Sequence, residues 1–216
     1  DFLGVTVFDR ETNSFSFRPG PIFSQFVLLD EINRATPKTQ SGLMQAMAEK
    51  EVSIDGSTRP LPEPFFVIAT QNPADAAGTY PLPESQLDRF LMRINLGLPS
   101  PRAEMELLRG EDRSRMLRDL EPVLAPEELQ ELRTALSRVH VAEPIRSYIL
   151  SILQDTRSSG EFRTGLSPRA GLALLACSRA WALIHGRGHV LPEDVQSVTP
   201  WVAAHRLRPR EPGDHA

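Results

Sequence analysis

Short apolar runs separated by polar turns fill the first hundred residues. Between residues 5 and 17, β-branched and aromatic side chains recur at near-alternate positions on both sides of the polar segment 9–14. This pattern predicts a β-hairpin. Alternation at residues 52–54 ends at the turn pair Asp55-Gly56, which predicts a second hairpin.

Two continuous apolar runs of strand length, Phe26–Leu29 and Phe65–Ala69, contain no polar residue. Runs of this kind are typical of strands covered on both faces in a parallel sheet. A third candidate strand, Leu91–Leu96, is interrupted by Arg93 and Asn95. A threonine cap followed by proline, at Thr36, predicts that a helix lies between the first two runs.

Helical spacing dominates the second half of the chain. Cap residues or first-turn prolines predict helix starts at Ser100, Pro126, Ser167 and Pro192. We therefore expect an α/β part over residues 1–99 and an all-helical part over residues 100–207. The tail, residues 208–216, holds two prolines, a glycine and several charges, and is expected to fray.

Composition narrows the class of protein. The chain has 216 residues, of which 40% are hydrophobic and 24% charged, as in globular domains. Its net charge of −4 gives no global positive field, so bulk charge does not support nucleic-acid binding. No apolar stretch approaches the roughly 20 residues that span a bilayer. The single cysteine, Cys177, excludes an internal disulfide and fits a reducing compartment.

The first candidate for chemistry is the acidic pair Asp30-Glu31, which directly follows the run Phe26–Leu29. Ligands bind at the carboxyl ends of strands in open α/β sheets. An aspartate there can hold Mg²⁺, which favours oxygen ligands, and the adjacent glutamate can orient or deprotonate a water. The alternative is an acidic pair entering a solvated loop.

Three further features are weaker when taken alone. Thr70-Gln71-Asn72-Pro73 ends the second apolar run, where the Asn72 amide could bind a phosphate oxygen, although Asn-Pro also favours a plain turn. Arg89 follows Asp88, so the two could simply form a surface ion pair. Arg169 occupies the first turn of a helix, where the dipole disfavours a cation, which suggests an anionic ligand.

These features occur together and in order, and the sequence closely resembles the MoxR group of AAA+ ATPases. The resemblance covers nearly the whole chain, to about Leu207. Its most specific motifs are Phe17–Phe23 (FRPGPIF), Leu28–Ala35 (LLDEINRA), Pro62–Pro73 (PEPFFVIATQNP), Gly78–Glu84 (GTYPLPE), Leu87–Phe90 (LDRF) and Ser167–Ala170 (SPRA).

The resemblance implies a fold and a role for each candidate residue. The fold would be α/β, a partial AAA+ P-loop NTPase core with a parallel sheet, followed by an all-α helical lid domain. The activity would be ATP hydrolysis, with ATP and Mg²⁺ as cofactors. The roles would be a Walker B aspartate on Mg²⁺ (Asp30), a glutamate that activates water (Glu31), sensor 1 near the γ-phosphate (Asn72), an arginine finger acting on a neighbouring subunit's ATP (Arg89) and sensor 2 on the lid (Arg169).

The resemblance also implies partners. The family forms nucleotide-dependent homo-oligomeric rings, commonly hexamers, and often works with von Willebrand A-domain proteins as a chaperone that matures target proteins or inserts metals into them. The hairpins around residues 5–17 and 52–62 would face the ring pore or a partner. No nucleic acid or membrane span is expected. The absence of an export signal and the need for ATP predict the cytoplasm.

The sequence departs from the family at the phosphate loop, G-x-x-x-x-G-K-[ST], whose amides and lysine cradle phosphates. The two lysines, Lys38 and Lys50, follow Pro37 and Glu49, so the chain has no Gly-Lys pair. In the family this loop and a central strand precede the segment seen here. We therefore expect the chain, which begins with Asp1, to be the C-terminal portion of an ATPase.

Such a portion is expected to expose strand edges and an apolar cleft, and not to bind ATP tightly by itself. Two alternatives stay open. One is a non-catalytic scaffold of the same fold, and the other is a Mg²⁺-dependent phosphohydrolase that uses Asp30 and Glu31 without a phosphate loop. The second alternative needs further carboxylates that converge on the metal.

Overall fold

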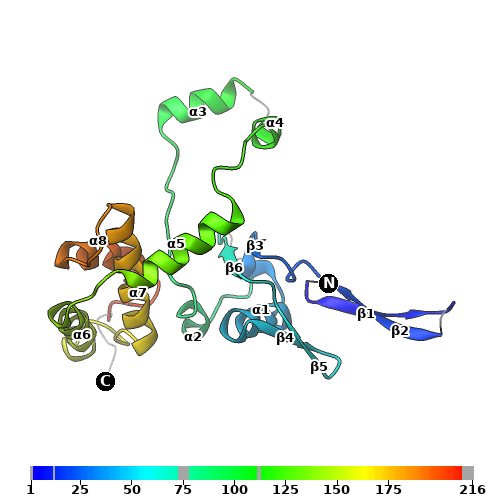
Figure 1. Cartoon of the computed structure of the whole chain (residues 1–216), viewed down its shortest axis with the longest axis horizontal. Helices are drawn as coiled ribbons and strands as arrows, with labels where there is room; N and C mark the ends of the chain where they lie inside the picture. The colour runs from blue at the N-terminus through cyan, green and yellow to red at the C-terminus, as the bar shows by residue number, and fades with distance from the viewer. Residues whose placement is uncertain (1, 12, 73–77, 111–112, 211–216) are drawn as a thin grey trace. The chain divides into compact units, whose positions relative to one another are not determined.

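The computed structural model describes residues 2–11, 13–72, 78–110 and 113–210 (Figure 1). It divides into two compact units, Asp1–Arg89 and Phe90–Ala216, each of which is described by itself. The expected division into residues 1–99 and 100–207 stays a prediction.

Both predicted hairpins are present in the first unit. β1 (Gly4–Asp9) pairs antiparallel with β2 (Ser14–Pro19), and β4 (Glu51–Ile54) pairs antiparallel with β5 (Ser57–Pro60). The second hairpin turns at Asp55-Gly56, where both residues have positive φ, 50° and 76°. This is the geometry that a two-residue hairpin turn requires.

A parallel pair of strands confirms the predicted parallel sheet. β3 (Phe26–Leu29) lies beside β6 (Phe66–Ala69), with Leu29 opposite Ala69. The expected burial of both faces is wrong, because one face is bare in the described residues. This open face carries four exposed side chains, Phe26 (60%), Leu28 (68%), Phe66 (48%) and Ile68 (51%). The expected apolar cleft stays a prediction.

Helix α1 (Pro37–Glu49) packs against the second hairpin. Thr36 caps it by accepting a hydrogen bond from the amide of Thr39, as its Thr-Pro start predicts. The short helix η1 (Ile32–Arg34) precedes α1 in the sequence, and the short helix α2 (Glu84–Leu87) follows β6. The core of this unit is a small buried cluster of Ile22, Ala46, Val52 and Leu61.

The second unit is helical, and the four predicted helix starts are confirmed. Its helices are α3 (Pro101–Leu108), α4 (Arg113–Arg118), α5 (Pro126–Arg138), α6 (Glu143–Ser158), α7 (Pro168–Ile184) and α8 (Pro192–Ala203). Their common core gathers apolar side chains mainly from α6, α7 and α8. No helix in the described part of the chain is long and apolar enough to cross a membrane.

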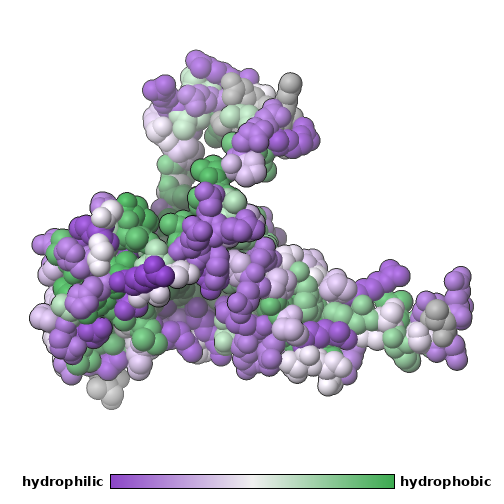
Figure 2. Space-filling view, in the orientation of Figure 1, coloured by the Kyte–Doolittle hydropathy of each residue, from purple (hydrophilic) through white to green (hydrophobic). Residues whose placement is uncertain are grey.

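The predicted strand over Leu91–Leu96 is wrong. The segment is irregular, and its neighbour is the end of α8: the Arg93 amide donates to the Trp201 carbonyl at 2.9 Å, and Arg206 donates to the Phe90 carbonyl at 2.6 Å. A strand needs a hydrogen-bonded partner strand, and none of the described residues supplies one here. Leu96 is 93% exposed, and Figure 2 shows the hydrophobic surface that leads to α3.

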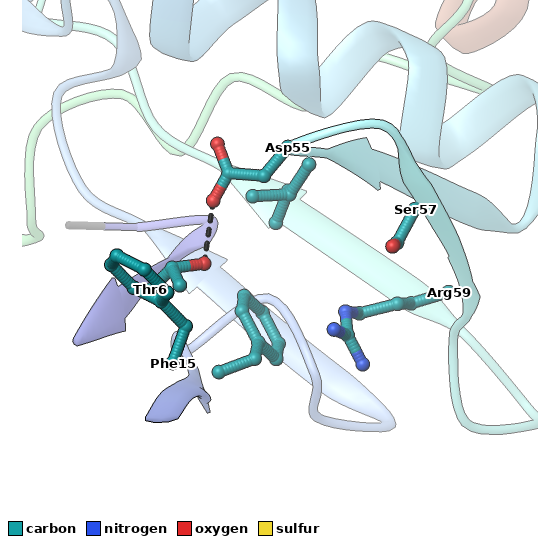
Figure 3. Close-up of a pocket in the computed structure, with 7 residues that line it drawn as sticks. Thr6, Phe15, Asp55, Ser57 and Arg59 are labelled. Carbon is teal, nitrogen blue, oxygen red and sulfur yellow. Dashed lines mark hydrogen bonds between the residues drawn. The ribbon is translucent and has the colours of Figure 1, made fainter. Parts of the chain in front are cut away.

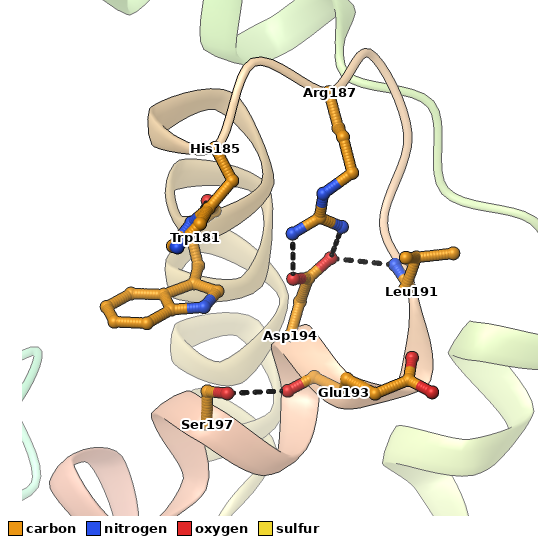
Figure 4. Close-up of polar contacts among 7 residues, drawn as sticks. All are labelled: Trp181, His185, Arg187, Leu191, Glu193, Asp194 and Ser197. Carbon is orange, nitrogen blue, oxygen red and sulfur yellow. Dashed lines mark hydrogen bonds and ion pairs between the residues drawn. The ribbon is translucent and has the colours of Figure 1, made fainter.

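An ion pair between the partly exposed Arg187 and the buried Asp194 holds the loop after α7 against the start of α8 (Figure 4). Asp194 is 1% exposed and accepts two hydrogen bonds from Arg187, at 2.6 and 2.7 Å, and one from the Leu191 amide at 2.8 Å. Burial acts to raise the pKa of Asp194. The Arg187 and Leu191 hydrogen bonds, with the charges of Arg187 and His185, outweigh burial and lower that pKa below its ordinary value.

The start of the expected frayed tail is paired. The Arg163 amide donates to the Arg208 carbonyl at 3.1 Å, and the Arg210 amide donates to the Glu161 carbonyl at 2.8 Å. Residues 211–216 lie outside the described part of the chain. The only cysteine of the sequence, Cys177, is buried, which raises the pKa of its thiol to about 11 against the lowering effect of the Arg206 charge.

Candidate functional site

The parallel register brings two loops together at the carboxyl ends of β3 and β6. Because Leu29 lies opposite Ala69, Asp30 and Thr70 are the next residues along the two strands. The Thr70 hydroxyl donates to Asp30 Oδ1 at 2.5 Å and accepts from the Glu31 amide at 2.9 Å. One side chain of β6's end therefore contacts both acidic residues that follow β3.

Backbone hydrogen bonds reinforce this junction. The Thr70 amide donates to the Leu29 carbonyl at 2.9 Å, and the Ile32 amide donates to the Thr70 carbonyl at 3.0 Å. Between these bonds Glu31 adopts the left-handed conformation, with φ 51° and ψ 55°. A non-glycine residue in this region costs of order 1 kcal/mol, so the contacts with Thr70 hold Glu31 in a conformation that it would not prefer alone.

The Glu31 carboxylate is engaged with its own loop. Glu31 Oε2 lies 2.8 Å from Arg34 Nε, and the two side chains are 36% and 49% exposed. Ion pairs this exposed contribute about 0–1 kcal/mol. The carboxylate can therefore leave Arg34 at little cost when another partner, such as a water, is presented to it.

Gln40 fixes the loop from inside α1. It is 3% exposed, and its Nε2 donates to the carbonyls of Ile32 at 3.1 Å and Tyr80 at 3.0 Å. The Tyr80 amide in turn donates to the Asn33 carbonyl at 2.6 Å. The segment around Tyr80, part of the motif GTYPLPE, is thus tied to the residues that follow the acidic pair.

The remaining predicted site residues lie in three places. Asn72 is exposed, two residues beyond Thr70, and therefore near the same edge of the strands. Pro73, which follows Asn72 and ends the motif Pro62–Pro73, lies outside the described residues. Arg89 is half-buried and its Nη1 donates to the carbonyl of Met44 on α1 at 2.6 Å. Arg169 is exposed in the first turn of α7, in the second unit, which is described separately.

The Asp30 carboxylate fits a magnesium ion whose other ligands would be water and phosphate oxygens. No group of three or more histidine, cysteine, aspartate or glutamate side chains that could hold a metal occurs among the described residues. Mg²⁺ keeps several waters and commonly binds one or two carboxylates plus substrate phosphates, so the exposed Asp30 carboxylate suffices. A phosphohydrolase built on converging carboxylates gains no support from the described residues.

Sequence reasoning missed three residues of this site. From the sequence, Thr70 has no role of its own and is only the first residue of the polar segment 70–73. Its position directly after an apolar strand was the available signal. Arg34 is recognised in the sequence only within the motif Leu28–Ala35, with no role of its own. Gln40 gave no signal, because a polar residue at a helical position looks like surface until the fold buries it.

Two family models match the chain. The model described as ATPase family associated with various cellular activities (AAA) matches residues 1–92, and the AAA lid domain model matches residues 154–216.

Individual proteins resemble the chain along nearly all of its length. The uncharacterized protein YeaC of Bacillus subtilis is 44% identical over 96% of the chain and 65% of its own length. The chaperone MoxR1 of Mycobacterium tuberculosis is 38% identical over 96% of the chain and 57% of its own length. The chain therefore spans less than two thirds of each of these relatives.

A crystal structure supports the same relationship. It is of a protein from Cytophaga hutchinsonii assigned as an ATPase, is 34% identical to the chain and superposes with a TM-score of 0.86. The match covers 97% of this chain and 66% of that one. Together with the parallel strands and the helical second unit, it confirms the predicted fold class, an AAA+ core with a helical lid.

Proposed function

The chain belongs to the MoxR group of the AAA ATPase family, and from this membership we propose that the edge formed by Asp30, Glu31 and Thr70 serves Mg²⁺-dependent ATP hydrolysis. The observation that carries the proposal is the double contact of the Thr70 hydroxyl with Asp30 and with the Glu31 amide. It holds the Asp30 carboxylate and the backbone of Glu31 at the carboxyl edge of parallel strands, where ligands bind in such sheets.

Each residue has a distinct task in this proposal. Asp30 holds Mg²⁺, which when bound neutralises charge on the phosphates of ATP. Glu31 releases Arg34 and orients the attacking water or accepts its proton. Asn72 lies near the γ-phosphate as sensor 1. Arg169, on the helical lid, contacts the nucleotide as sensor 2. Phosphoryl transfer mainly requires positioning and charge stabilisation, which this set of residues can provide.

Arg89 is proposed as the arginine finger that acts in trans. One of its guanidinium N–H groups is used by the Met44 carbonyl. The guanidinium carries five donors, so the others can bind an anion while this contact holds the side chain. A finger supplied by a neighbour would make hydrolysis depend on assembly of a ring, for which we propose a homo-hexamer.

The biological role is inferred from family membership and not from the geometry of the site. We propose a chaperone in the cytoplasm that acts on a protein client, for maturation, assembly or metal insertion, with a von Willebrand A-domain protein as partner. Because the chain contains no Gly-Lys phosphate loop, we propose that these 216 residues alone do not bind ATP tightly. A non-catalytic scaffold of the same fold is the alternative.

The proposal is tested by measuring phosphate release by the native gene product while Mg²⁺ is titrated. Hydrolysis is expected to require Mg²⁺. Asp30→Asn is expected to raise the Mg²⁺ concentration needed for half-maximal rate and to lower the maximal rate. The matched control is Asp119→Asn, an exposed aspartate after α4, which should change neither. A rate of hydrolysis that changes neither with Mg²⁺ concentration nor with Asp30→Asn would contradict the assignment of Asp30 as the magnesium ligand.

A further inference from the structure

The two hairpins of the first unit face each other across a cleft (Figure 3). Thr6, Phe15 and Phe17 share one face of β1–β2, because Thr6 lies opposite Phe17 and residues two apart point the same way. On β4–β5, Ile54 lies opposite Ser57, and Arg59 is two residues further on. With Asp55, these side chains line a cavity of about 480 Å³ that is partly open to solvent.

The cleft contains a cation, Arg59, that has no counter-ion among the described residues. The guanidinium of Arg59 stacks on Phe17, with Cζ 4.0 Å from the ring centroid. Its Nε is buried and has no hydrogen-bond partner, and no carboxylate of the described residues pairs with this side chain. Stacking uses the face of a guanidinium and leaves its in-plane N–H groups available for a carboxylate.

The rest of the cleft offers aromatic surface on β1–β2 and, at the turn of the second hairpin, an acceptor that is already engaged. Phe15 is 74% exposed and packs against Phe8, with ring centroids 5.0 Å apart, and Phe8 is 44% exposed. Asp55 accepts a hydrogen bond from the Thr6 hydroxyl, which joins the turn of the second hairpin to strand β1 across the cleft. Exposed aromatic rings beside polar groups are typical of protein-binding sites.

We propose that this cleft docks an extended segment of a protein partner in which an aspartate or glutamate stands beside an apolar residue. The carboxylate pairs with the in-plane N–H groups of Arg59, and the apolar side chain covers Phe15. Charge complementarity at Arg59 selects the acidic residue. A nucleic-acid backbone fits poorly, because the cleft presents one cation beside the Asp55 carboxylate in a chain of net charge −4.

The inference deepens the proposed function and takes one point from it, namely that the partner is a protein. It is tested without nucleotide, so that its failure would leave the ATPase proposal untouched. A library of random peptides displayed on phage is selected on the full chain, and the enriched peptides are synthesised with a fluorescent label. We expect enriched peptides to share an acidic residue next to an apolar one.

Fluorescence anisotropy then measures the role of Arg59. Arg59→Gln should weaken binding of an enriched peptide by about tenfold, as expected when a charge-assisted hydrogen bond is lost. Replacing the acidic residue of the peptide by its amide should cost as much with the wild-type chain and nothing with Arg59→Gln. The matched control is Arg18→Gln, which removes the same charge from the opposite face of β2 and should leave the affinity unchanged.

The remaining outcomes are equally decisive. If Arg59→Gln perturbs the far-ultraviolet circular dichroism, Arg59→Lys retains the charge without the planar fork and should still weaken binding severalfold. The inference is overturned if enriched peptides lack acidic residues, or if they bind the Arg59 variants as tightly as the wild type. It is also overturned if a single-stranded oligonucleotide displaces the peptides and itself depends on Arg59.

Discussion

The side-chain hydroxyl of Thr70 donates a hydrogen bond to the carboxylate of Asp30 across the parallel strands, 40 residues apart in the chain. The same hydroxyl accepts from the amide of Glu31, so its proton and one lone pair are both used. A hydroxyl is the only common group of this size that can do both. Thr70 is therefore a positioning residue for the acidic pair.

Thr70→Val tests that role, because valine keeps the shape and removes both hydrogen bonds. We expect the kcat for ATP hydrolysis by the native gene product to fall about 10–100-fold, the usual cost of losing a residue that orients a metal ligand. The KM for ATP should change little, because the side chain does not contact nucleotide in the proposed site.

Thr70→Ser is the matched variant, since it restores the hydroxyl and removes only a methyl group. It should recover most of the kcat. An undiminished kcat with Thr70→Val would mean that the two hydrogen bonds do not matter, and it would contradict the positioning role, as would a kcat that falls with serine but not with valine.

Arg89→Ala should remove the stimulation that assembly gives to hydrolysis, because the arginine would act on a neighbour's nucleotide. Fingers of this kind contribute about 10³–10⁵ in rate in related GTPases. Mixing Arg89→Ala subunits with Glu31→Gln subunits should restore part of the activity, since each supplies the residue that the other lacks. Phosphate release across a series of mixing ratios measures this. An absence of restored activity in mixed rings that have been verified by native mass spectrometry would argue against action in trans.

Asp194 predicts how the stability of the helical unit depends on pH. Its lowered pKa means that the folded state favours the charged carboxylate. The contribution is therefore present above the unfolded pKa of about 3.9 and is lost as the pH falls through the lower folded value. Asp194→Asn should lower the thermal midpoint by about 4–8 °C at pH 7. The difference from the wild type should shrink below about pH 4, as measured by circular dichroism. A pH-independent difference would contradict the role of the charge.

Much of the fold could be predicted from local pattern. The hairpin at Asp55-Gly56 and the caps at Thr36 and Ser167 depend on residues near each other in sequence, and all three are present. The position of Asp30 and Glu31 after β3 was predictable for the same reason, because strand-end chemistry follows directly from the apolar run.

The features that were missed depend on partners far along the chain. Leu91–Leu96 has an apolar strand-like composition, but a strand also needs a neighbour, and hydropathy does not identify one. Gln40 bonds a carbonyl 40 residues away, and Arg59 stacks on Phe17 in another hairpin. Such contacts appear only when the tertiary structure brings the elements together.

The most direct test of the central claim is to compare nucleotide binding and hydrolysis by Glu31→Gln in the native gene product. Glutamine keeps the shape of the side chain but can neither accept a proton nor carry a negative charge. We predict that phosphate release falls by at least about 100-fold, in the range of general-base catalysis, while the Kd for ATP and ring formation are retained. Undiminished hydrolysis, or loss of binding together with hydrolysis, would contradict the assignment of Glu31 as the residue that activates water.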